Sequence, residues 1–587
     1  MTWKKQLAKW LSFKGLDKEL RNQLEDSEQN QKMLEDCFYK NLEFGTGGIR
    51  GELGPGTNRL NIYTIRKAAK GLGQYISQKG EEARKRGIVI AYDCRYKSKE
   101  FALEVAKTVG IQGIKVYLFN EQRPTPELSF AVRYLNAFVG VVITASHNPP
   151  EYNGFKVYAE DGGQITPDIA KEITFFINSI QDELSISVMD ETKLLELGLL
   201  TYIGSEIDAA YLELLETIQL NREFVKHTGN NLKIVFTPLH GTAHKLVLIG
   251  LLRSGYKNIT TVKEQEIPDP EFRTVKSPNP EEPEAFKMAI QYGKQVNADI
   301  LMATDPDADR LGVAAKDENG EYAILNGSQM GALMMHYLLL QKEKKGILPR
   351  NGAIIKTIVT SEIGRAIAED FGISTIDTLT GFKYIGEKIN EFDQTKEHIF
   401  QFGFEESYGY LIGDFVRDKD AVQAAVFAAE VAAYYKLRGK TLFDGLEELY
   451  NKYGYYLESL KSFTLKGKEG TEKIKGVLNF FRENRPSKIA GITITRVEDY
   501  LYGHHFNLLS GEKISIQLPK SNVIKFHLAN DSCFTIRPSG TEPKVKFYFS
   551  VKGTSKRQSI EQLKQVEKGV LDIVEDFLQE NSEEEES

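Results

Sequence analysis

The sequence predicts an α/β protein built from several similar domains in series, followed by an α+β domain. At 587 residues the chain is too long for one hydrophobic core and corresponds to roughly four domains of about 150 residues. From residue 87, short apolar runs repeatedly end in polar loops and are followed by helical stretches, which is the pattern of α/β units. From about residue 455 this pattern gives way to β-like segments and a closing helix. We therefore expect domains at 1–220, 221–340, 341–454 and 455–587.

The composition is that of an ordinary globular protein, with 41% hydrophobic and 27% charged residues. A net charge of -7 gives no basic footprint for nucleic acid, so we expect a small substrate and no nucleic-acid partner. The three cysteines are far apart, which indicates neither disulfides nor a zinc site and fits a reducing cytoplasm. No run of about 18 apolar residues occurs, so no membrane span is predicted.

The N-terminal part begins with helices, because apolar residues recur at helical spacing up to about residue 40. A glycine-rich loop, 44–51, follows and contains Arg50. It matches neither a dinucleotide fingerprint, which needs a third glycine where Arg50 stands, nor a P-loop. Two interpretations remain open: a tight turn, or backbone amides and Arg50 facing a phosphate.

A nucleophile loop follows the apolar run 138–143, which we expect to be a buried strand. Its residues, 144–149, include Ser146 and His147 and end in a proline that forces a turn. The strand would present the Ser146 hydroxyl in a rigid polar loop. A Ser-His neighbour pair alone is equally compatible with an ordinary polar loop.

A metal loop follows the strand expected at 300–303 and contains Asp305, Asp307 and Asp309. Alternate residues of an extended segment share a face, so three carboxylates at this spacing can converge on one hard cation. Oxygen ligands favour Mg²⁺ over zinc, and Mg²⁺ usually shares its shell with a phosphate. The neighbouring Arg310 could clamp the same anion.

Two later loops carry groups suited to a sugar phosphate. The loop 403–409 holds Glu405 and Ser407 between glycines, which suits vicinal sugar hydroxyls or a simple acidic turn. The loop 537–544 is either a phosphate nest or an ordinary turn. Its candidate phosphate ligands are Arg537, Ser539, Gly540 and Thr541.

Together, the nucleophile loop, the metal loop, the sugar loop and the phosphate loop resemble the motifs of the α-D-phosphohexomutase family, in its phosphoglucomutase/phosphomannomutase group. The match extends from the loop at Phe44 to the loop at Arg537 and keeps the family's motif order. The resemblance implies three related mixed or parallel α/β domains and a C-terminal α+β domain around a central cleft.

The same resemblance implies a role for each candidate residue. Ser146 would be the phosphoserine and, with Asp305, Asp307 and Asp309, would bind Mg²⁺. Glu405 and Ser407 would contact the sugar. Lys383, in the segment 380–383, is expected either to contact the other side of the sugar ring or to be a surface lysine. Arg537, Ser539, Gly540 and Thr541 would hold the substrate's phosphate. The supporting active-site residues would be Arg50, His147, Lys156 and Arg310.

The mechanism implied is transfer of a phosphoryl group from Ser146 to a sugar monophosphate, with glucose 1,6-bisphosphate as activator and intermediate. Either Lys156 or His147 would exchange the proton of the sugar hydroxyl.

We expect glucose 1-phosphate and glucose 6-phosphate as substrates and a monomer or weak dimer. The sequence GFEESYG and the residues Pro306 and Ala308 depart from many relatives, which leaves phosphomannomutase and phosphopentomutase activity open. A Mg²⁺-dependent sugar phosphatase and a silent binding protein are more remote alternatives.

Overall fold

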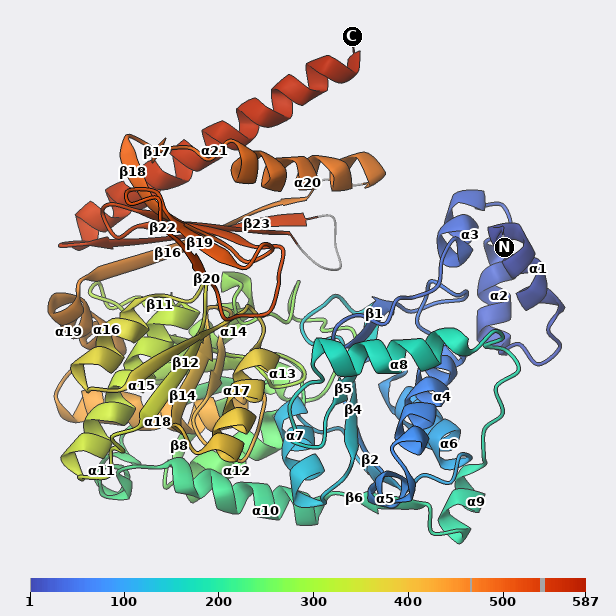
Figure 1. The fold of residues 1–587 in the computed structure, drawn as a ribbon. Coiled ribbons are helices and arrows are strands. Elements are labelled where there is room, and N and C mark those ends of the chain that lie inside the picture. The colour runs from blue at the N-terminus through green and yellow to red at the C-terminus, as the bar shows by residue number, and fades with distance from the viewer. Residues whose placement is uncertain (1, 465–466, 539–543, 587) are drawn as a thin grey trace. The chain divides into compact units, whose positions relative to one another are not determined.

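The computed structural model describes residues 2–464, 467–538 and 544–586. The chain divides into two compact bodies, Met1–Ile355 with Gly381–Asp444, and Lys356–Thr380 with Gly445–Ser587. Two of the three boundaries fall within the elements β12 (Gly352–Thr357) and α19 (Leu442–Tyr453), and the third, between residues 380 and 381, lies outside helices and strands. Figure 1 labels the elements of both bodies.

The first sheet of the first body is mixed and has the strand order β1-β5-β4-β2-β3-β6. Strands β2, β3, β4 and β6 run parallel, whereas β5 is antiparallel to both β4 and β1. The sequence of β2 is Ile-Val-Ile-Ala-Tyr, and all five residues are buried, as expected for a parallel strand covered on both faces. The strands are β1 (Gly48–Glu52), β2 (Ile88–Tyr92), β3 (Val116–Phe119), β4 (Val139–Ile143), β5 (Tyr152–Tyr158) and β6 (Leu200–Ile203).

Helices cover this sheet. Helix α4 packs against α6 and α8, and α7 packs against β2 and β4 (Figure 1). Asn61 begins α4 with a capping box in which its side chain and that of Thr64 each bond the other's backbone N–H. The helices are α1 (Trp3–Ser12), α2 (Lys18–Asp26), α3 (Gln31–Phe38), α4 (Ile62–Gln78), α5 (Glu81–Arg86), α6 (Ser98–Gly110), α7 (Thr125–Tyr134), α8 (Pro167–Ser179), α9 (Glu191–Glu196) and α10 (Ser205–Leu215), followed by the 3-10 turn Glu216–Ile218.

The second sheet has the order β11-β10-β9-β7-β8, with β7, β8 and β9 parallel and β10 and β11 added antiparallel. Its strands are β7 (Lys233–Thr237), β8 (Asn258–Thr261), β9 (Ile300–Thr304), β10 (Leu311–Lys316) and β11 (Tyr322–Leu325). The associated helices are α11 (Arg222–Thr228), α12 (His244–Arg253), α13 (Lys263–Glu266) and α14 (Lys287–Val296), with a 3-10 turn at Pro283–Phe286.

The remaining elements of the first body surround a short hairpin, in which β14 pairs antiparallel with β15. Helix α18 is rich in alanine, the residue with the highest helix propensity, and is almost wholly buried. The elements are α15 (Gly327–Lys344), α17 (Phe382–Thr395), β14 (Ile399–Glu405), β15 (Gly409–Leu411) and α18 (Ala421–Leu437).

The second body contains an antiparallel sheet of order β16-β23-β22-β21-β18-β19-β20, with β17 paired to β18. Helix α21 packs on β23 and β16. Its elements are α16 (Ile363–Asp370), β13 (Ser374–Thr378), β16 (Tyr455–Thr464), α20 (Gly467–Glu483), β17 (Lys488–Ile489), β18 (Ile492–Asp499), β19 (His504–Asn507), β20 (Lys513–Ser515), β21 (Ile524–Leu528), β22 (Cys533–Pro538), β23 (Lys544–Gly553) and α21 (Lys556–Glu586). The β-rich C-terminal part and its closing helix, expected from the sequence, are present.

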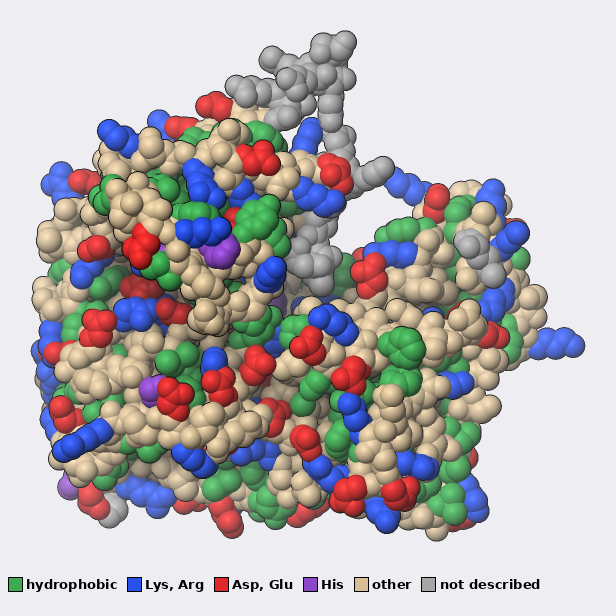
Figure 2. Space-filling model, viewed as in Figure 1, with side chains coloured by type: hydrophobic (Ala, Val, Ile, Leu, Met, Phe, Trp, Pro, Cys, Tyr) green, Lys and Arg blue, Asp and Glu red, His purple; other side chains and the backbone are tan. Residues whose placement is uncertain are grey.

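The surface carries charges of both signs. On the face shown in Figure 2, Lys and Arg side chains are interspersed with Asp and Glu. Among the described residues, no helix is long and apolar enough to cross a bilayer.

Candidate active site

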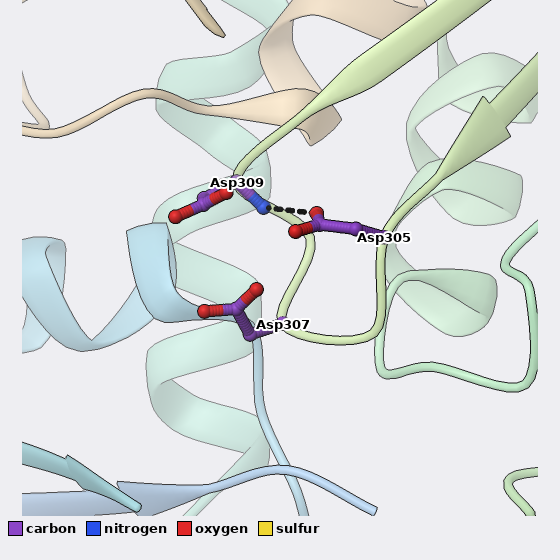
Figure 3. A group of neighbouring side chains, drawn as sticks. All are labelled: Asp305, Asp307 and Asp309. Atoms are coloured by element: carbon purple, nitrogen blue, oxygen red, sulfur yellow. Dashed lines mark hydrogen bonds between the residues drawn. The ribbon is translucent and has the colours of Figure 1, made fainter. Parts of the chain in front are cut away.

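Three buried carboxylates form the centre of the candidate site. Asp305, Asp307 and Asp309 follow β9, and one ligand atom from each lies within 4.8 Å of those of the other two. Figure 3 shows the three side chains around their loop, with the backbone N–H of Asp309 donating to Asp305 Oδ1 at 3.1 Å. The predicted convergence is therefore present. The reason given for it was wrong, because the loop is a turn with Ala308 at φ 56° and not an extended segment.

The donor set fits a hard divalent cation. All three carboxyl groups are buried, and Asp307 Oδ1 and Asp309 Oδ1 have no hydrogen-bond partner among the described residues. Burial and the neighbouring charges of Asp309 and Asp307 raise the pKa of Asp305 well above its usual range. Oxygen atoms left without partners in a buried, negatively charged loop are suitable ligands for Mg²⁺.

Two lysines offset part of the charge of this loop. Lys156 Nζ lies 2.7 Å from Asp307 Oδ2 and 3.7 Å from Asp309 Oδ2. Lys419 Nζ lies 2.8 Å from Asp309 Oδ2. Burial alone would raise the pKa of Asp307, but the charge and hydrogen bond of Lys156 lower it below its usual value. Asp307 is therefore ionised in the folded protein.

The predicted nucleophile lies in contact with this loop. Ser146 Oγ donates to Asp305 Oδ2 at 2.7 Å and lies 3.2 Å from His147 Nδ1. Ser146 has φ 53°, in the left-handed region that non-glycine residues rarely adopt. Burial, Arg310 and Arg50 lower the pKa of His147 well below its usual value, so its imidazole is uncharged at neutral pH. A hydroxyl, a neutral imidazole and a carboxylate cluster thus meet at one place.

Two arginines lie beside the nucleophile and metal loops. Arg50, on β1, donates from Nη1 to Asn148 Oδ1 at 2.9 Å. Arg310 pairs with Glu281, and its Nε lies 3.8 Å from Asp309 Oδ1. Burial opposes the charge of Arg310, but Glu281 and Asp309 raise its pKa, so it remains a cation. Both predicted arginines are positioned to attract an anion to this site.

The predicted sugar loop lies between β14 and β15 in the same body. Glu405 is the last residue of β14 and is buried, and Ser407 follows two residues later in the loop. Burial raises the pKa of Glu405 to about 7, although the charge of Lys419 opposes this shift. Lys383, at the start of α17, donates to the carbonyl oxygen of Thr46 at 3.2 Å in the glycine-rich loop. Lys383 therefore lies beside the loop that leads to Arg50.

The predicted phosphate loop belongs to the second body. Arg537 lies in β22 and is partly exposed. Ser539, Gly540 and Thr541 lie outside the described residues. The contacts expected of these four residues therefore stay predictions.

Lys419 and Thr125 belong to the site but were not predicted from the sequence. Lys419 contacts Asp309, and the charge of Glu405 also acts on it, so it connects the metal loop with the sugar loop. Thr125, at the start of α7, donates its N–H to the Asp307 carbonyl oxygen at 2.8 Å and its hydroxyl to Asp307 Oδ2 at 3.0 Å. In the sequence, Lys419 lies between Asp418 and Asp420, and Asp420 is an ordinary N-cap of the alanine-rich helix, so the run gives only a weak signal. Thr125 offers no signal beyond the Thr-Pro helix start.

Family models match most of the chain. Phosphoglucomutase/phosphomannomutase alpha/beta/alpha domains I, II and III match residues 41–183, 209–320 and 326–453. These matches include the loops of Ser146, the three aspartates and Glu405.

Curated relatives extend the likeness. The chain is 38% identical over 542 residues to a phosphoglucomutase of Staphylococcus haemolyticus, covering 92% of this chain and 95% of the relative. It is 39% identical over 546 residues to a phosphoglucomutase of Staphylococcus aureus strain MRSA252, covering 92% and 94%.

Solved structures share the fold at lower identity. Parafusin of Paramecium, a phosphoglucomutase in its open form, matches with TM-score 0.66 and 18% identity, covering 92% of this chain and 96% of that one. A phosphoglucomutase/phosphomannomutase family protein of Burkholderia thailandensis matches with TM-score 0.63 and 20% identity, covering 91% and 97%. With these matches over three consecutive domains and nearly its full length, the chain belongs to the phosphoglucomutase/phosphomannomutase family.

Proposed function

We propose that this protein is a phosphoglucomutase that interconverts glucose 1-phosphate and glucose 6-phosphate through a phosphorylated Ser146. One observation carries the proposal: the Ser146 hydroxyl is hydrogen-bonded at 2.7 Å to a carboxylate of a buried three-aspartate loop. A phosphate on Ser146 would lie against the same oxygens that suit a divalent cation. A stored phosphoryl group beside such a site is what a phosphomutase needs.

The proposed metal is Mg²⁺, held by Asp305, Asp307 and Asp309 together with the phosphate of Ser146. When bound, it would offset negative charge on the transferring phosphoryl group. Lys156, Arg50 and Arg310 would supply further positive charge around that group.

Transfer forms a bond between the sugar hydroxyl oxygen and phosphorus and breaks the bond to Ser146 Oγ. The hydroxyl proton passes to His147 or Lys156, and the Ser146 oxygen released from phosphorus takes up a proton from the same group. His147 is favoured as acceptor because its imidazole is uncharged, whereas Lys156 is engaged with Asp307. The glucose 1,6-bisphosphate formed then returns its other phosphate to Ser146.

Substrate binding is assigned to the later loops. Glu405 and Ser407 would bind sugar hydroxyls, Lys383 would add a contact, and the segment of Arg537, Ser539, Gly540 and Thr541 would hold the second phosphate. The domains would be 1–220, 221–340, 341–454 and 455–587 around a central cleft. We propose a cytoplasmic enzyme, monomeric or weakly dimeric, that acts on small sugar phosphates.

Relative kcat/KM values test the substrate, because they measure discrimination in the transition state. With glucose 1,6-bisphosphate as activator, glucose 1-phosphate is expected to exceed mannose 1-phosphate, ribose 1-phosphate and deoxyribose 1-phosphate. A pentose phosphate that exceeds glucose 1-phosphate tenfold, or about 1.4 kcal/mol, would replace the proposal by a phosphopentomutase. A mannose preference would indicate a phosphomannomutase, and phosphate release without isomerisation a sugar phosphatase.

A further inference from the structure

The side chain of Arg95 binds the backbone of the loop that carries Ser146. Its Nη2 donates to the carbonyl oxygens of Ser146 and Asn148, both at 2.5 Å. Its Nη1 donates to the carbonyl oxygens of Pro149 at 2.8 Å and Tyr152 at 3.1 Å. One guanidinium group therefore binds four carbonyl oxygens within seven consecutive residues, which only the forked donors of arginine can do.

Asp93 fixes the position of this guanidinium group. Arg95 Nε lies 3.3 Å from Asp93 Oδ2, and both side chains are fully buried. Asp93 Oδ1 accepts from the Arg95 backbone N–H at 3.0 Å and from Ser98 Oγ at 2.7 Å. The ring of Phe272 lies against the guanidinium, with 5.0 Å between Arg95 Cζ and the ring centroid. The arginine is therefore held on several sides before it reaches the loop.

A second connection runs from Asp93 to Ser146 through the end of β4 and Thr144. The Asp93 backbone N–H donates to the Ile143 carbonyl oxygen at 3.1 Å, and Thr144 Oγ1 accepts from the Ser146 N–H at 2.8 Å. Asp93 and Thr144 follow the paired ends of β2 and β4, where Tyr92 lies opposite Ile143. The parallel register of two buried strands thus places Asp93 beside the nucleophile loop.

The backbone of Ser146 requires such support. Its φ of 53° is unfavourable for a residue with a side chain, and such conformations persist only where surrounding contacts fix them. Arg95 binds the carbonyl side of Ser146 and Thr144 binds its N–H side. The two contacts together fix the peptide groups on both sides of the residue, and with them the direction of Oγ.

We propose that Arg95, supported by Asp93, is a positioning residue that holds Ser146 aligned for phosphoryl transfer. The inference rests on the proposed phosphorylation of Ser146. Arg95 does not contact the three aspartates in the structure, and its effect passes through the loop backbone. Small misplacements of a reacting group lower the rate steeply, so loss of this support should act on kcat more than on KM.

The experiment compares Arg95→Ala with Arg86→Ala. Arg86 is a matched control because it also donates to two backbone carbonyl oxygens, those of Asn136 and Ala137, and also lies against an aromatic ring, that of Phe138. For each variant we would measure kcat and KM for glucose 1-phosphate, thermal unfolding, Ser146 phosphorylation by glucose 1,6-bisphosphate, and activity with low millimolar guanidinium.

We expect Arg95→Ala to lower kcat about 100-fold with KM within about threefold, and guanidinium to restore kcat at least tenfold in a saturable manner. Arg86→Ala should keep wild-type kcat and gain nothing from guanidinium. A folded Arg95→Ala protein with kcat within about threefold of wild type would overturn the inference. A loss of kcat that guanidinium does not restore would also overturn it.

If Arg95→Ala does not fold, Arg95→Lys decides the question, because one ammonium group cannot bind four carbonyl oxygens. A kcat-selective loss then supports the inference, and unchanged kcat overturns it. Failure of the proposed function is recognised separately: wild-type protein would then carry no phosphate on Ser146 after incubation with the bisphosphate.

Discussion

At the residue scale, Ser146 combines an unfavourable backbone conformation with the contact on which the proposed chemistry depends. We expect Ser146→Ala to lower turnover of glucose 1-phosphate by about 10³-fold or more, because it removes the hydroxyl that donates to Asp305 and that would store the phosphoryl group. Mass spectrometry should find phosphate on the peptide containing Ser146 in wild-type protein and not in the variant. Ser185→Ala, at an exposed serine of the same body, is the control.

An active Ser146→Ala protein would exclude the covalent mechanism. A fully active wild-type preparation without phosphate on Ser146, in the presence of the bisphosphate, would exclude it equally.

At the element scale, the sequence predicted strands best where both faces are covered. The runs at 88–92 and 300–303 correspond to β2 and β9, since uninterrupted apolar residues are typical of buried parallel strands. Strand β16 was missed because its outer end, residues 460–464, is largely exposed and has no continuous apolar run. Its pairing with β23 over ten residues is a long-range contact that local periodicity does not reveal.

The candidate site shows the same difference between features visible in local sequence and features set by long-range contacts. Ser146, the three aspartates and Glu405 were predicted because they lie just beyond apolar runs expected to be strands, where parallel α/β sheets place ligands; Glu405 is in fact the last residue of its strand. Lys419, Thr125 and Arg95 reach the site from segments far away in sequence. Their partners are carbonyl oxygens or carboxylates on other elements, and only the folded chain brings these together.

Strand β16 also provides a test of stability in the second body. Glu458 has a buried carboxyl oxygen without a hydrogen-bond partner among the described residues, and burial raises its pKa to about 7. Between pH 4.5, the ordinary pKa of a glutamate, and about pH 7, Glu458 in the folded protein keeps a proton that the unfolded chain has lost. Glu458 therefore makes the protein less stable as pH rises through this window, and the loss is constant above it.

Glu458→Gln removes this charge and keeps the size and polarity of the side chain. We expect the variant to be more stable than wild type at pH 8, by on the order of 1 to 3 kcal/mol, and to lose this advantage near pH 4.5. Urea unfolding over this pH range measures it, with exposed Glu561→Gln as control. An advantage independent of pH would contradict the assignment.

At the scale of the whole molecule, the two bodies divide the proposed functions unequally. The first body holds Ser146, the carboxylate loop and Glu405, and so contains every described group assigned to phosphoryl transfer. The second body holds Arg537 and its loop, to which only phosphate binding is assigned. Metal binding should therefore stabilise the protein through the first body.

The stability of the first body should depend on Mg²⁺, because Lys156 and Lys419 leave the charge of three buried carboxylates only partly offset. A ligand that binds only the folded state at 100 times its Kd stabilises it by about 2.7 kcal/mol. We expect added Mg²⁺ to raise the unfolding midpoint of wild-type protein and chelation to abolish turnover. Asp307→Asn removes one ligand charge and should lose most of the Mg²⁺-dependent shift while remaining folded, as calorimetry with and without Mg²⁺ would measure. An equal Mg²⁺ shift in both proteins, or undiminished turnover after exhaustive chelation, would exclude this loop as the metal site.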